Sequence, residues 1–410
     1  MLRVAVVGGS MGGLTAALLL RDLGYGVDVF ERSPVDLTGF GAGIVAHEAS
    51  VRYFVGRTTM SLDTMTVPVG RYRLLDGSGA LLFEEPVAYR FAAWGSLYRA
   101  LLAEFGRERY FQGMALAGFS QDERGVDIRF ASGKDGRYDL LVLADGIQST
   151  GRRRLFPGVE PVYSGYVAWR GTVAERDLPA RVLERIDGTL TYVLVPHSHI
   201  LVYPIPGADG RVDRGHRLWN FVWYRNVEKG DPLDELMTDC DGFPHPVSLR
   251  PGRVQDRYVR ELKDLATECL PEEAVAVVAA TEHPFIQVVM DVASPRMAVG
   301  RVCLLGDAAF AARPHAAAGT AKAAENAWLL AEAIEAFAGD LSSALAAWSD
   351  HQTALGANLV ARARHIGEGS QFRCDWRPGD PGLRFGLYEP GDSSIWTRSP
   401  RSRVVWRRPS

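Results

Sequence analysis

The segment at residues 302–325 places an acidic residue and a histidine close to a glycine turn. An apolar run is followed by Gly306 and Asp307, and Pro314 and His315 come shortly before an alanine-rich stretch. A strand that delivers a carboxylate into a turn before a helix sets that carboxylate beside free backbone N–H groups. The small side chains that follow would let a flat ligand lie against the backbone. Taken alone, the segment could equally be an ordinary strand-to-helix connection.

The N-terminal segment has the spacing of a dinucleotide-binding turn. An apolar run at residues 2–7 leads into a glycine-rich turn and a helical pattern, and a second apolar run ends at Glu31, 18 residues after Gly13. In this context Gly8 permits a tight turn, Gly13 permits close packing of helix on strand, and Glu31 accepts from a ribose hydroxyl. Ser10 stands in place of the usual middle glycine. The predicted cofactor contacts here are Gly8, Ser10, Met11, Gly13, Glu31 and Arg32.

A second glycine-dense stretch at residues 39–44 follows closely. A simple NAD domain has no need of it, whereas a flavin requires backbone to approach the edge of its ring system. Gly43 is therefore predicted to contact the cofactor. His47 lies three residues beyond this stretch. It would face the ring or the substrate, or else lie in an exposed loop.

Composition limits the classes of protein to which the chain could belong. A length of 410 residues predicts two or three domains with a sizeable core. The net charge of −3 gives no reason to expect nucleic acid or an anionic membrane as a partner. The four cysteines form no CxxC pair, which favours a reducing compartment, the cytoplasm, and no metal site. No segment approaches the roughly 18 uninterrupted apolar residues of a membrane span.

Strand-like and helical patterns alternate along the chain. A hairpin is predicted at residues 67–89 around a turn signal at 76–79, and a helix at 94–105. Aromatic-rich strands fill residues 163–285, and helices are predicted at 324–337 and 341–366. The arginine-rich end of the chain, from residue 398, is predicted to be a solvated tail. These patterns predict a mixed α/β protein.

Two motifs resemble those of a known enzyme family. Asp145 and Gly146, with Ser149 and Arg152 after them, resemble the DG motif of single-component flavin-dependent aromatic hydroxylases, the p-hydroxybenzoate hydroxylase fold. The Gly-Asp pair at residues 306–307 resembles that family's GD motif. The resemblance covers nearly the whole chain and is stronger still to the 2,6-dihydroxypyridine 3-monooxygenase-like branch. The segments that carry this are GGSMGGLTAALLLRD, ERSP with GFGAGIV, YSGYVAWRG, LVYPIPG, WYRNV, LDELMTD and GDAAFAARPHAAAGTAKA.

The resemblance implies a fold and a division of the chain. A Rossmann-like FAD-binding domain would be formed by residues 1–70, 95–160 and 286–340. An interwoven β-sheet domain for the substrate would take residues 71–94 and 161–285, and a C-terminal helix and tail would take 341–410. FAD would be bound non-covalently and NADH or NADPH would be the co-substrate. A small aromatic substrate and dioxygen would be the other partners, and a homodimer is possible.

The resemblance also implies roles for individual residues. Asp307 would lie over the ribityl–phosphate region of FAD, and Asp145 and Gly146 would support FAD and the pyridine nucleotide. The loop that lines the flavin and the substrate would include Pro314, Gly319, Thr320 and Ala321. Trp94 departs from the arginine or glutamine of many relatives, and Phe310 stands where a histidine is frequent.

The implied reaction is hydroxylation of an electron-rich aromatic or N-heteroaromatic ring through a flavin hydroperoxide. A base with a pKa near 7 would help to deprotonate a ring hydroxyl, with His315 as first candidate and His47 and Tyr203 after it. Tyr192, Tyr203 and Trp223 could contact the substrate together with Pro314, or could be core aromatics. His197 and His199 would belong to a hairpin loop rather than a metal site.

Three alternatives compete with this interpretation of the sequence. A flavin-dependent halogenase would need a WxWxIP segment, which is absent. A urate- or purine-type hydroxylase, or a biosynthetic tailoring monooxygenase of the same fold, fits the same motifs. A nucleotide-binding scaffold without turnover is the non-enzymatic alternative.

Overall fold

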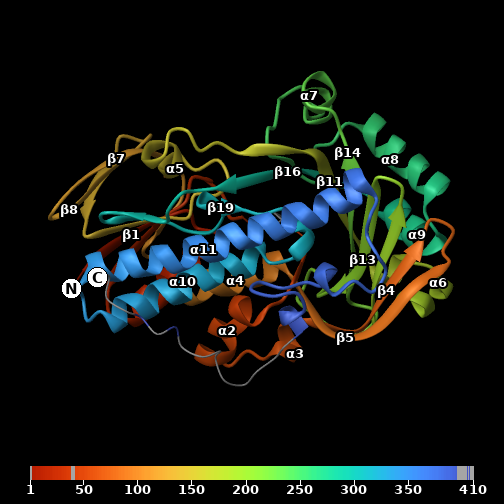
Figure 1. Cartoon of the computed structure of the whole chain (residues 1–410), viewed down its shortest axis with the longest axis horizontal. Coiled ribbons are helices and arrows are strands. Elements are labelled where there is room, and N and C mark those ends of the chain that lie inside the picture. Colours follow the sequence, from red (N-terminus) through yellow and green to blue (C-terminus); the bar gives the residue numbers. More distant parts are fainter. Residues whose placement is uncertain (1, 38–41, 395–403, 405, 407–410) are drawn as a thin grey trace.

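The structure is a computed structural model of the chain (Figure 1). It describes residues 2–37, 42–394, 404 and 406. Gly39, Phe40 and Gly41 of the second glycine-dense stretch, and most of the arginine-rich tail, lie outside the described residues.

A six-stranded sheet carries the glycine turns. Its order is β17-β18-β10-β1-β2-β6, parallel except for the β17–β18 pair. Its strands are β1 Arg3–Val7, β2 Gly26–Phe30, β6 Tyr110–Phe111, β10 Leu140–Leu143, β17 Ala298–Val299 and β18 Val302–Leu304. Because β1, β10 and β18 are parallel neighbours, their carboxyl ends bring Gly8, Asp145 and Gly306 to one edge of the sheet.

Helices bury the valine- and leucine-rich strands of this sheet. The helices α1 Met11–Asp22, α4 Trp94–Phe105 and α10 Gly319–Ala336 contribute to the same hydrophobic core as β1, β2 and β10. Residues 4–6 of β1 and 141–143 of β10 are fully buried. Because these strands are covered on both faces, their sequences are continuous apolar runs.

The second sheet is larger and mostly antiparallel. Its order is β15-β16-β11-β14-β13-β12-β4-β5-β3, and β12 and β4 are its parallel pair. Its strands are β3 Gly43–Val45, β4 Val67–Asp76, β5 Leu81–Ala93, β11 Val162–Ala174, β12 Thr189–Val195, β13 Ser198–Ile205, β14 Leu218–Asn226, β15 Ser248–Leu249 and β16 Phe285–Ala293, with β19 Phe310–Ala311 paired to β16.

The two faces of the large sheet bury different side chains. One face carries Trp169, Phe221 and Trp223. It packs against α6 Ala180–Ile186, α8 Asp256–Cys269 and α9 Glu272–Ala280, which lie on the right in Figure 1. The opposite face carries Tyr203 and Tyr224. Alternation along each strand therefore decides which aromatic rings can face a ligand.

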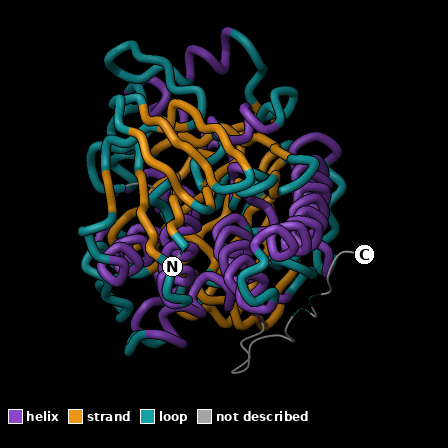
Figure 2. The backbone as a smooth tube through the Cα atoms, turned by 90° about the vertical axis from the view of Figure 1, so that its left-hand side faces the viewer, coloured by secondary structure: helices purple, strands orange, loops and turns teal. Residues whose placement is uncertain are grey.

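The remaining elements complete the cover. They are β7 Leu116–Asp122, β8 Gly125–Phe130 and β9 Asp135–Tyr138, which form a separate sheet, and α2 Glu48–Arg57, α3 Leu62–Met65, α5 Thr150–Leu155 and α7 Asp231–Leu236. The long helix α11 Leu341–Glu368 runs beside α10 and reaches the large sheet (Figure 1). Figure 2, turned by 90°, shows helices packed beside the strands. A π-helical turn, Gly369–Arg373, follows it directly.

The predicted fold class is confirmed, with a Rossmann-like sheet and a separate β-sheet in one mixed α/β chain. The strand β16 pairs with β11 in the large sheet as far as Asp291, and its last two residues pair with β19. The domain boundaries themselves stay a prediction. Within the described part of the chain, no helix combines the length and the apolar character needed to cross a membrane.

Candidate functional site

The glycine turn after β1 leaves no room for side chains. Gly8 has φ +107°, and a Cβ there would lie 2.1 Å from the carbonyl oxygen of Ala144. A Cβ on Gly13 would lie 1.9 Å from the carbonyl oxygen of Gly8. The backbone at this turn is therefore as close to β10 and α1 as glycine alone permits.

The N-terminus of α1 offers groups that suit a dinucleotide. Ser10 precedes the helix and its side chain makes no capping hydrogen bond, and Met11 is buried in the first turn. Glu31 is buried at the end of β2, where its carboxylate accepts from the backbone N–H of Gly9 and of Ser33, each at 2.8 Å. Arg32 is exposed beside it. An acid anchored in this way keeps lone pairs for ribose hydroxyls, so these residues fit the adenosine end of FAD.

Arg152 joins the DG turn to the GD turn. This fully buried side chain donates to the backbone carbonyls of Ile147, Val159 and Ala308. Asp145 accepts from the N–H of Gly151 at 3.2 Å, while its Oδ1 is buried without a hydrogen-bond partner in the described part of the chain. Burial raises the pKa of the Asp145 carboxyl. The arginine of the DG motif is therefore a structural tie between two cofactor segments.

Asp307 is held by a lysine that the sequence analysis did not single out. Its Oδ1 accepts from Lys322 Nζ at 2.8 Å, and Lys322 also donates to the carbonyl of Phe310. The Lys322 side chain is 1% exposed and that of Asp307 is 53% exposed. One carboxylate oxygen is therefore fixed from inside the protein while the group still faces outward to a ligand.

A cavity of about 420 Å³ lies between these loops and the large sheet. Asp307, Pro314, and Gly319 and Thr320 at the start of α10 line it, together with Gly43 at the start of β3. Residues of other strands of the large sheet also line it, among them Arg170, Tyr203, Tyr224 and Gln287. This volume is that of a small-molecule site. The structure thus brings together Pro314 and Tyr203 with four of the predicted flavin contacts.

Tyr203 lies in the cavity wall with its hydroxyl turned to backbone. It donates to the carbonyl oxygen of Gly43 at 3.0 Å, and its ring stacks on Phe91 with the centroids 4.2 Å apart. Burial raises the pKa of the Tyr203 phenol. The neutral phenol of Tyr203 therefore fixes the backbone at Gly43. It is not suited to act as a base near pH 7.

The other two predicted substrate residues do not line the cavity. Trp223 is fully buried on the opposite face of the sheet, where its Nε1 donates to Ser198 Oγ at 2.9 Å. Tyr192 lies on the cavity face but is 4% exposed and stacks on His199 with the centroids 5.9 Å apart. We therefore do not propose Tyr192 or Trp223 as a substrate contact.

The first candidate for the base is also outside the cavity. His315 is 5% exposed, with its Nε2 2.7 Å from the hydroxyl oxygen of Tyr166 and its ring centroid 4.6 Å from that of Tyr224. Burial, and then the charges of His199 and Arg313, hold the pKa of His315 well below its ordinary value. His315 therefore supports the wall from behind, and its burial does not favour the base with a pKa near 7 that was predicted at this position.

His47 holds the cofactor loop in place. It precedes α2, is 3% exposed, and its Nε2 donates to the carbonyl of Ala317 at 3.0 Å. Ala317 has φ +53° and lines the cavity. His47 thus braces a strained residue beside the predicted flavin and does not face the ligand.

Two further predicted positions lie apart from the cavity. Ala321 is buried among the residues between α10 and α11. Gly146 has φ +77°, which fits the turn that follows Asp145. His199 is not in a hairpin loop as predicted: it lies on β13, 1% exposed, and burial lowers its pKa to about 3.

We expect the free energy of unfolding to fall as the pH drops from about 6.5 towards 3. The unfolded chain binds a proton at His199 near its ordinary pKa, whereas the folded chain does not until about pH 3. His199→Asn should flatten this slope, which urea unfolding at stepped pH would measure. An unchanged slope in the variant would contradict the burial of a neutral His199.

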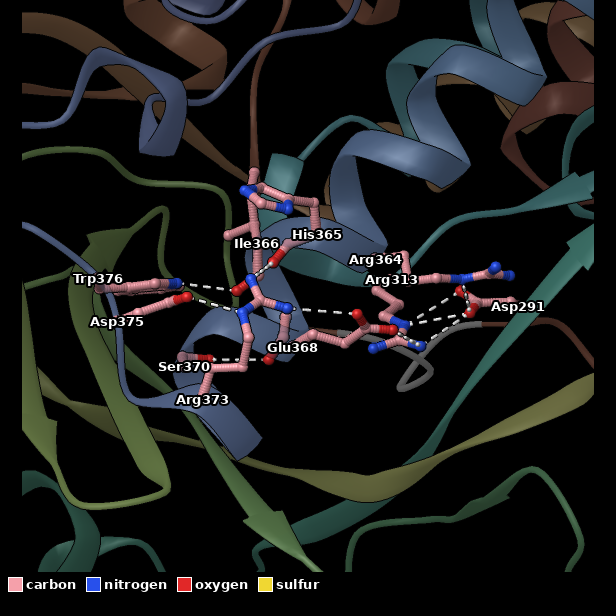
Figure 3. Close-up of polar contacts among 11 residues, drawn as sticks. Asp291, Arg313, Arg364, His365, Ile366, Glu368, Ser370, Arg373, Asp375 and Trp376 are labelled. Atoms are coloured by element: carbon pink, nitrogen blue, oxygen red, sulfur yellow. Dashed lines mark hydrogen bonds and ion pairs between the residues drawn. The ribbon is translucent and has the colours of Figure 1, made fainter.

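Charged residues behind the Pro314 loop form a continuous network (Figure 3). Asp291 is buried and accepts from Arg313 Nε and Nη2 at 3.0 to 3.2 Å and from Arg364 Nε at 3.1 Å. Glu368 at the end of α11 lies 3.7 Å from Arg313 and 3.4 Å from Arg373. The residue before Pro314 is therefore fixed by β16 and by the C-terminal helix.

Sequence analysis missed three residues of this site. Arg170 shares the cavity face of β11 with Ala168, and a charge on such a strand face is a signal of function. Gln287 and Lys322 carry no comparable signal, because their positions depend on pairing between distant segments.

Comparisons with known proteins agree with this geometry. A family model described as FAD binding domain-like matches residues 163–291. The chain is 39% identical to 2,6-dihydroxypyridine 3-monooxygenase of Paenarthrobacter nicotinovorans, over 97% of this chain and 98% of that one. The solved structure of 2,6-dihydroxypyridine-3-hydroxylase from Arthrobacter nicotinovorans superimposes with a TM-score of 0.90 at 38% identity, covering 95% of this chain and 98% of that one.

A more distant structure shares the fold. Klebsiella pneumoniae HpxO, in complex with FAD and uric acid, superimposes with a TM-score of 0.74 at 20% identity, covering 91% of this chain and 89% of that chain.

Proposed function

The chain belongs to the FAD-dependent aromatic hydroxylases of the p-hydroxybenzoate hydroxylase fold, and from this premise we propose that its substrate is a hydroxylated pyridine. It is an FAD-dependent monooxygenase that uses NADH or NADPH and dioxygen. The observation that carries the proposed substrate class is the 39% identity to a hydroxypyridine monooxygenase over 97% of the chain. The size of the cavity, about 420 Å³, supports a single small ring lying beside the cofactor.

FAD, when bound, takes a hydride from NADH or NADPH and activates dioxygen for transfer of one oxygen atom to the ring. We propose that Glu31 holds its ribose, that the turn from Gly8 to Gly13 receives its pyrophosphate, and that Asp307 meets its ribityl chain. Asp145 lies at the sheet edge between these groups. Gly43, Pro314, Gly319 and Thr320 would contact the ring system from the loop side.

The protein's own contribution is to hold the substrate ring and to exclude water. Leu201, Val222 and Phe285 give the sheet side of the cavity apolar surface around its few polar groups. Pro314 and Ala317, on the loop side, are fixed from behind by Arg313 and His47. A rigid, mostly apolar wall restricts the ring to few orientations, which sets the carbon that is hydroxylated.

The test is a panel of ring compounds with the purified yellow holoenzyme. We expect 2,6-dihydroxypyridine to accelerate NADH or NADPH oxidation at least tenfold, with a product heavier by one oxygen atom. Uric acid, salicylate and a ring without hydroxyls serve as comparison arms. If uric acid alone strongly accelerated NADH or NADPH oxidation, the substrate would be a purine and not a hydroxypyridine. If none of the ring compounds were converted to a product, the result would favour the scaffold without turnover.

We also propose a cellular compartment, a domain division and an oligomeric state. The four cysteines are free, which favours a reducing compartment such as the cytoplasm. The three-part division of the chain described under Sequence analysis would be tested by limited proteolysis. A homodimer would be tested by sedimentation.

A further inference from the structure

We propose that Arg170 and Gln287 bind the substrate as a ring oxyanion, so that a fixed positive charge, and not a protein base, keeps the reacting ring ionised. The inference rests on the proposed function and names the ionic form of the substrate that the cavity selects.

The guanidinium of Arg170 is fixed in the cavity wall by neutral groups. Its Nη1 donates to Gln287 Oε1 at 2.8 Å and its Nη2 donates to the carbonyl of Gly43 at 2.8 Å. Its Nε is buried and has no hydrogen-bond partner among the residues that the structure describes. No carboxylate of the described residues forms an ion pair with Arg170. The positive charge of Arg170 is therefore not compensated by any residue that the structure describes, and Arg250 is a second arginine that lines the cavity.

The amide of Gln287 is oriented by this contact. Because its Oε1 accepts from Arg170, the same amide turns its NH₂ group to another direction, and Gln287 lines the cavity. The Nε2 group forms no hydrogen bond with any residue that the structure describes. Arg170 and Gln287 therefore both present donors, and a ligand that satisfies them must bring acceptor atoms.

None of the described cavity-lining side chains is suited to remove a proton near pH 7. The tyrosines, Tyr203 and Tyr224, have phenol pKa values raised by burial. Asp307 is paired with Lys322. Two histidines lie behind the wall: His315 packs against Tyr224, and the Nε2 of His47 donates to the carbonyl of Ala317. The proton of the ring hydroxyl must then pass to water as the substrate binds, and the charge that remains on the ring oxygen is stabilised by Arg170.

The expected consequence is a lowered pKa of the bound substrate. An opposite charge within hydrogen-bonding distance lowers the pKa of an acid by about 1 to 3 units. The ultraviolet absorption of 2,6-dihydroxypyridine, free and bound to the oxidised holoenzyme, measures this shift without turnover. We expect the wild type to bind the anion at least one pH unit below the titration of the free compound. Arg170→Gln should lose the shift and bind at least tenfold more weakly.

Matched variants separate charge from folding. Arg170→Lys keeps a positive charge and should keep part of the shift. Arg225→Gln removes a half-buried arginine from the opposite face of β14, where it lies over Trp223, and should leave the shift unchanged. FAD content and melting temperature report whether each variant is folded.

Two outcomes would overturn the proposal. One is a bound substrate whose pKa is the same in folded Arg170→Gln as in the wild type. The other is Arg170-dependent binding of benzoate, which has no ring hydroxyl, at the affinity of 2,6-dihydroxypyridine. Either result leaves the proposed function standing if the wild type still forms the hydroxylated product, and that function fails on the product assay alone.

Discussion

Asp307→Ala is expected to weaken FAD binding about ten- to hundredfold, the contribution of a hydrogen bond to a charged group. It should also lower the free energy of unfolding by about 2 to 3 kcal/mol, because it leaves the ammonium of Lys322 buried without its counter-charge. That loss is smaller than for a wholly buried pair, since the Asp307 side chain is 53% exposed. Flavin fluorescence on dilution and urea unfolding of the apoprotein measure the two effects.

A second substitution separates the two roles of Asp307. Asp307→Ala combined with Lys322→Met removes both charges and should recover most of the lost stability. FAD affinity should stay low in the double variant, because the carboxylate that meets the ribityl chain is still absent. Recovery of FAD affinity together with stability would show that Asp307 acts only through Lys322.

Asp291→Ala is expected to destabilise the protein by about 3 to 5 kcal/mol, because it removes the buried partner of Arg313. The two side chains are 4% and 6% exposed, and Arg313 directly precedes Pro314 in the cavity wall. A displaced Pro314 loop should also admit water, so that less product forms per NADH consumed. Urea unfolding and the ratio of product to NADH measure these effects.

Arg364→Ala is the control for this network. Arg364 donates to the same carboxylate at 3.1 Å, but its side chain is 49% exposed. An exposed partner contributes about 0 to 1 kcal/mol, so the control should remain close to the wild type in stability and in product ratio. If Arg364→Ala and Asp291→Ala lost stability and product ratio equally, the effect of Asp291 on the Pro314 loop would not pass through Arg313.

The cofactor turns could be predicted from the sequence because each depends on neighbouring residues. The spacing of Gly8, Gly13 and Glu31 is set by one strand, one turn and one helix. Their convergence with Asp145 and Asp307 follows from the parallel order of β1, β10 and β18. Local pattern and sheet topology together were therefore enough for the FAD side of the site.

The substrate side depends on strand register, which local pattern does not determine. Trp223 and Tyr224 are neighbours in β14, yet one lies in the far core and the other in the cavity wall. A shift of one residue in register exchanges the two faces. The same uncertainty left Arg170 without a role in the sequence analysis.

His315 shows a related limit. Its position next to Pro314 favoured the cavity, but the short turn Pro314–Ala316 points the imidazole back towards Tyr166. The partners that hold this loop are distant in the chain, with Asp291 22 residues from Arg313 and 73 residues from Arg364. Such contacts follow from the tertiary fold and carry no local signal.

The most direct test of the central claim is the origin of the oxygen atom in the product. The holoenzyme would turn over 2,6-dihydroxypyridine with NADH under ¹⁸O₂ in ordinary water, and mass spectrometry would read the product. We expect one labelled oxygen atom in each product molecule. A product whose added oxygen is unlabelled would come from water, and would contradict a monooxygenase.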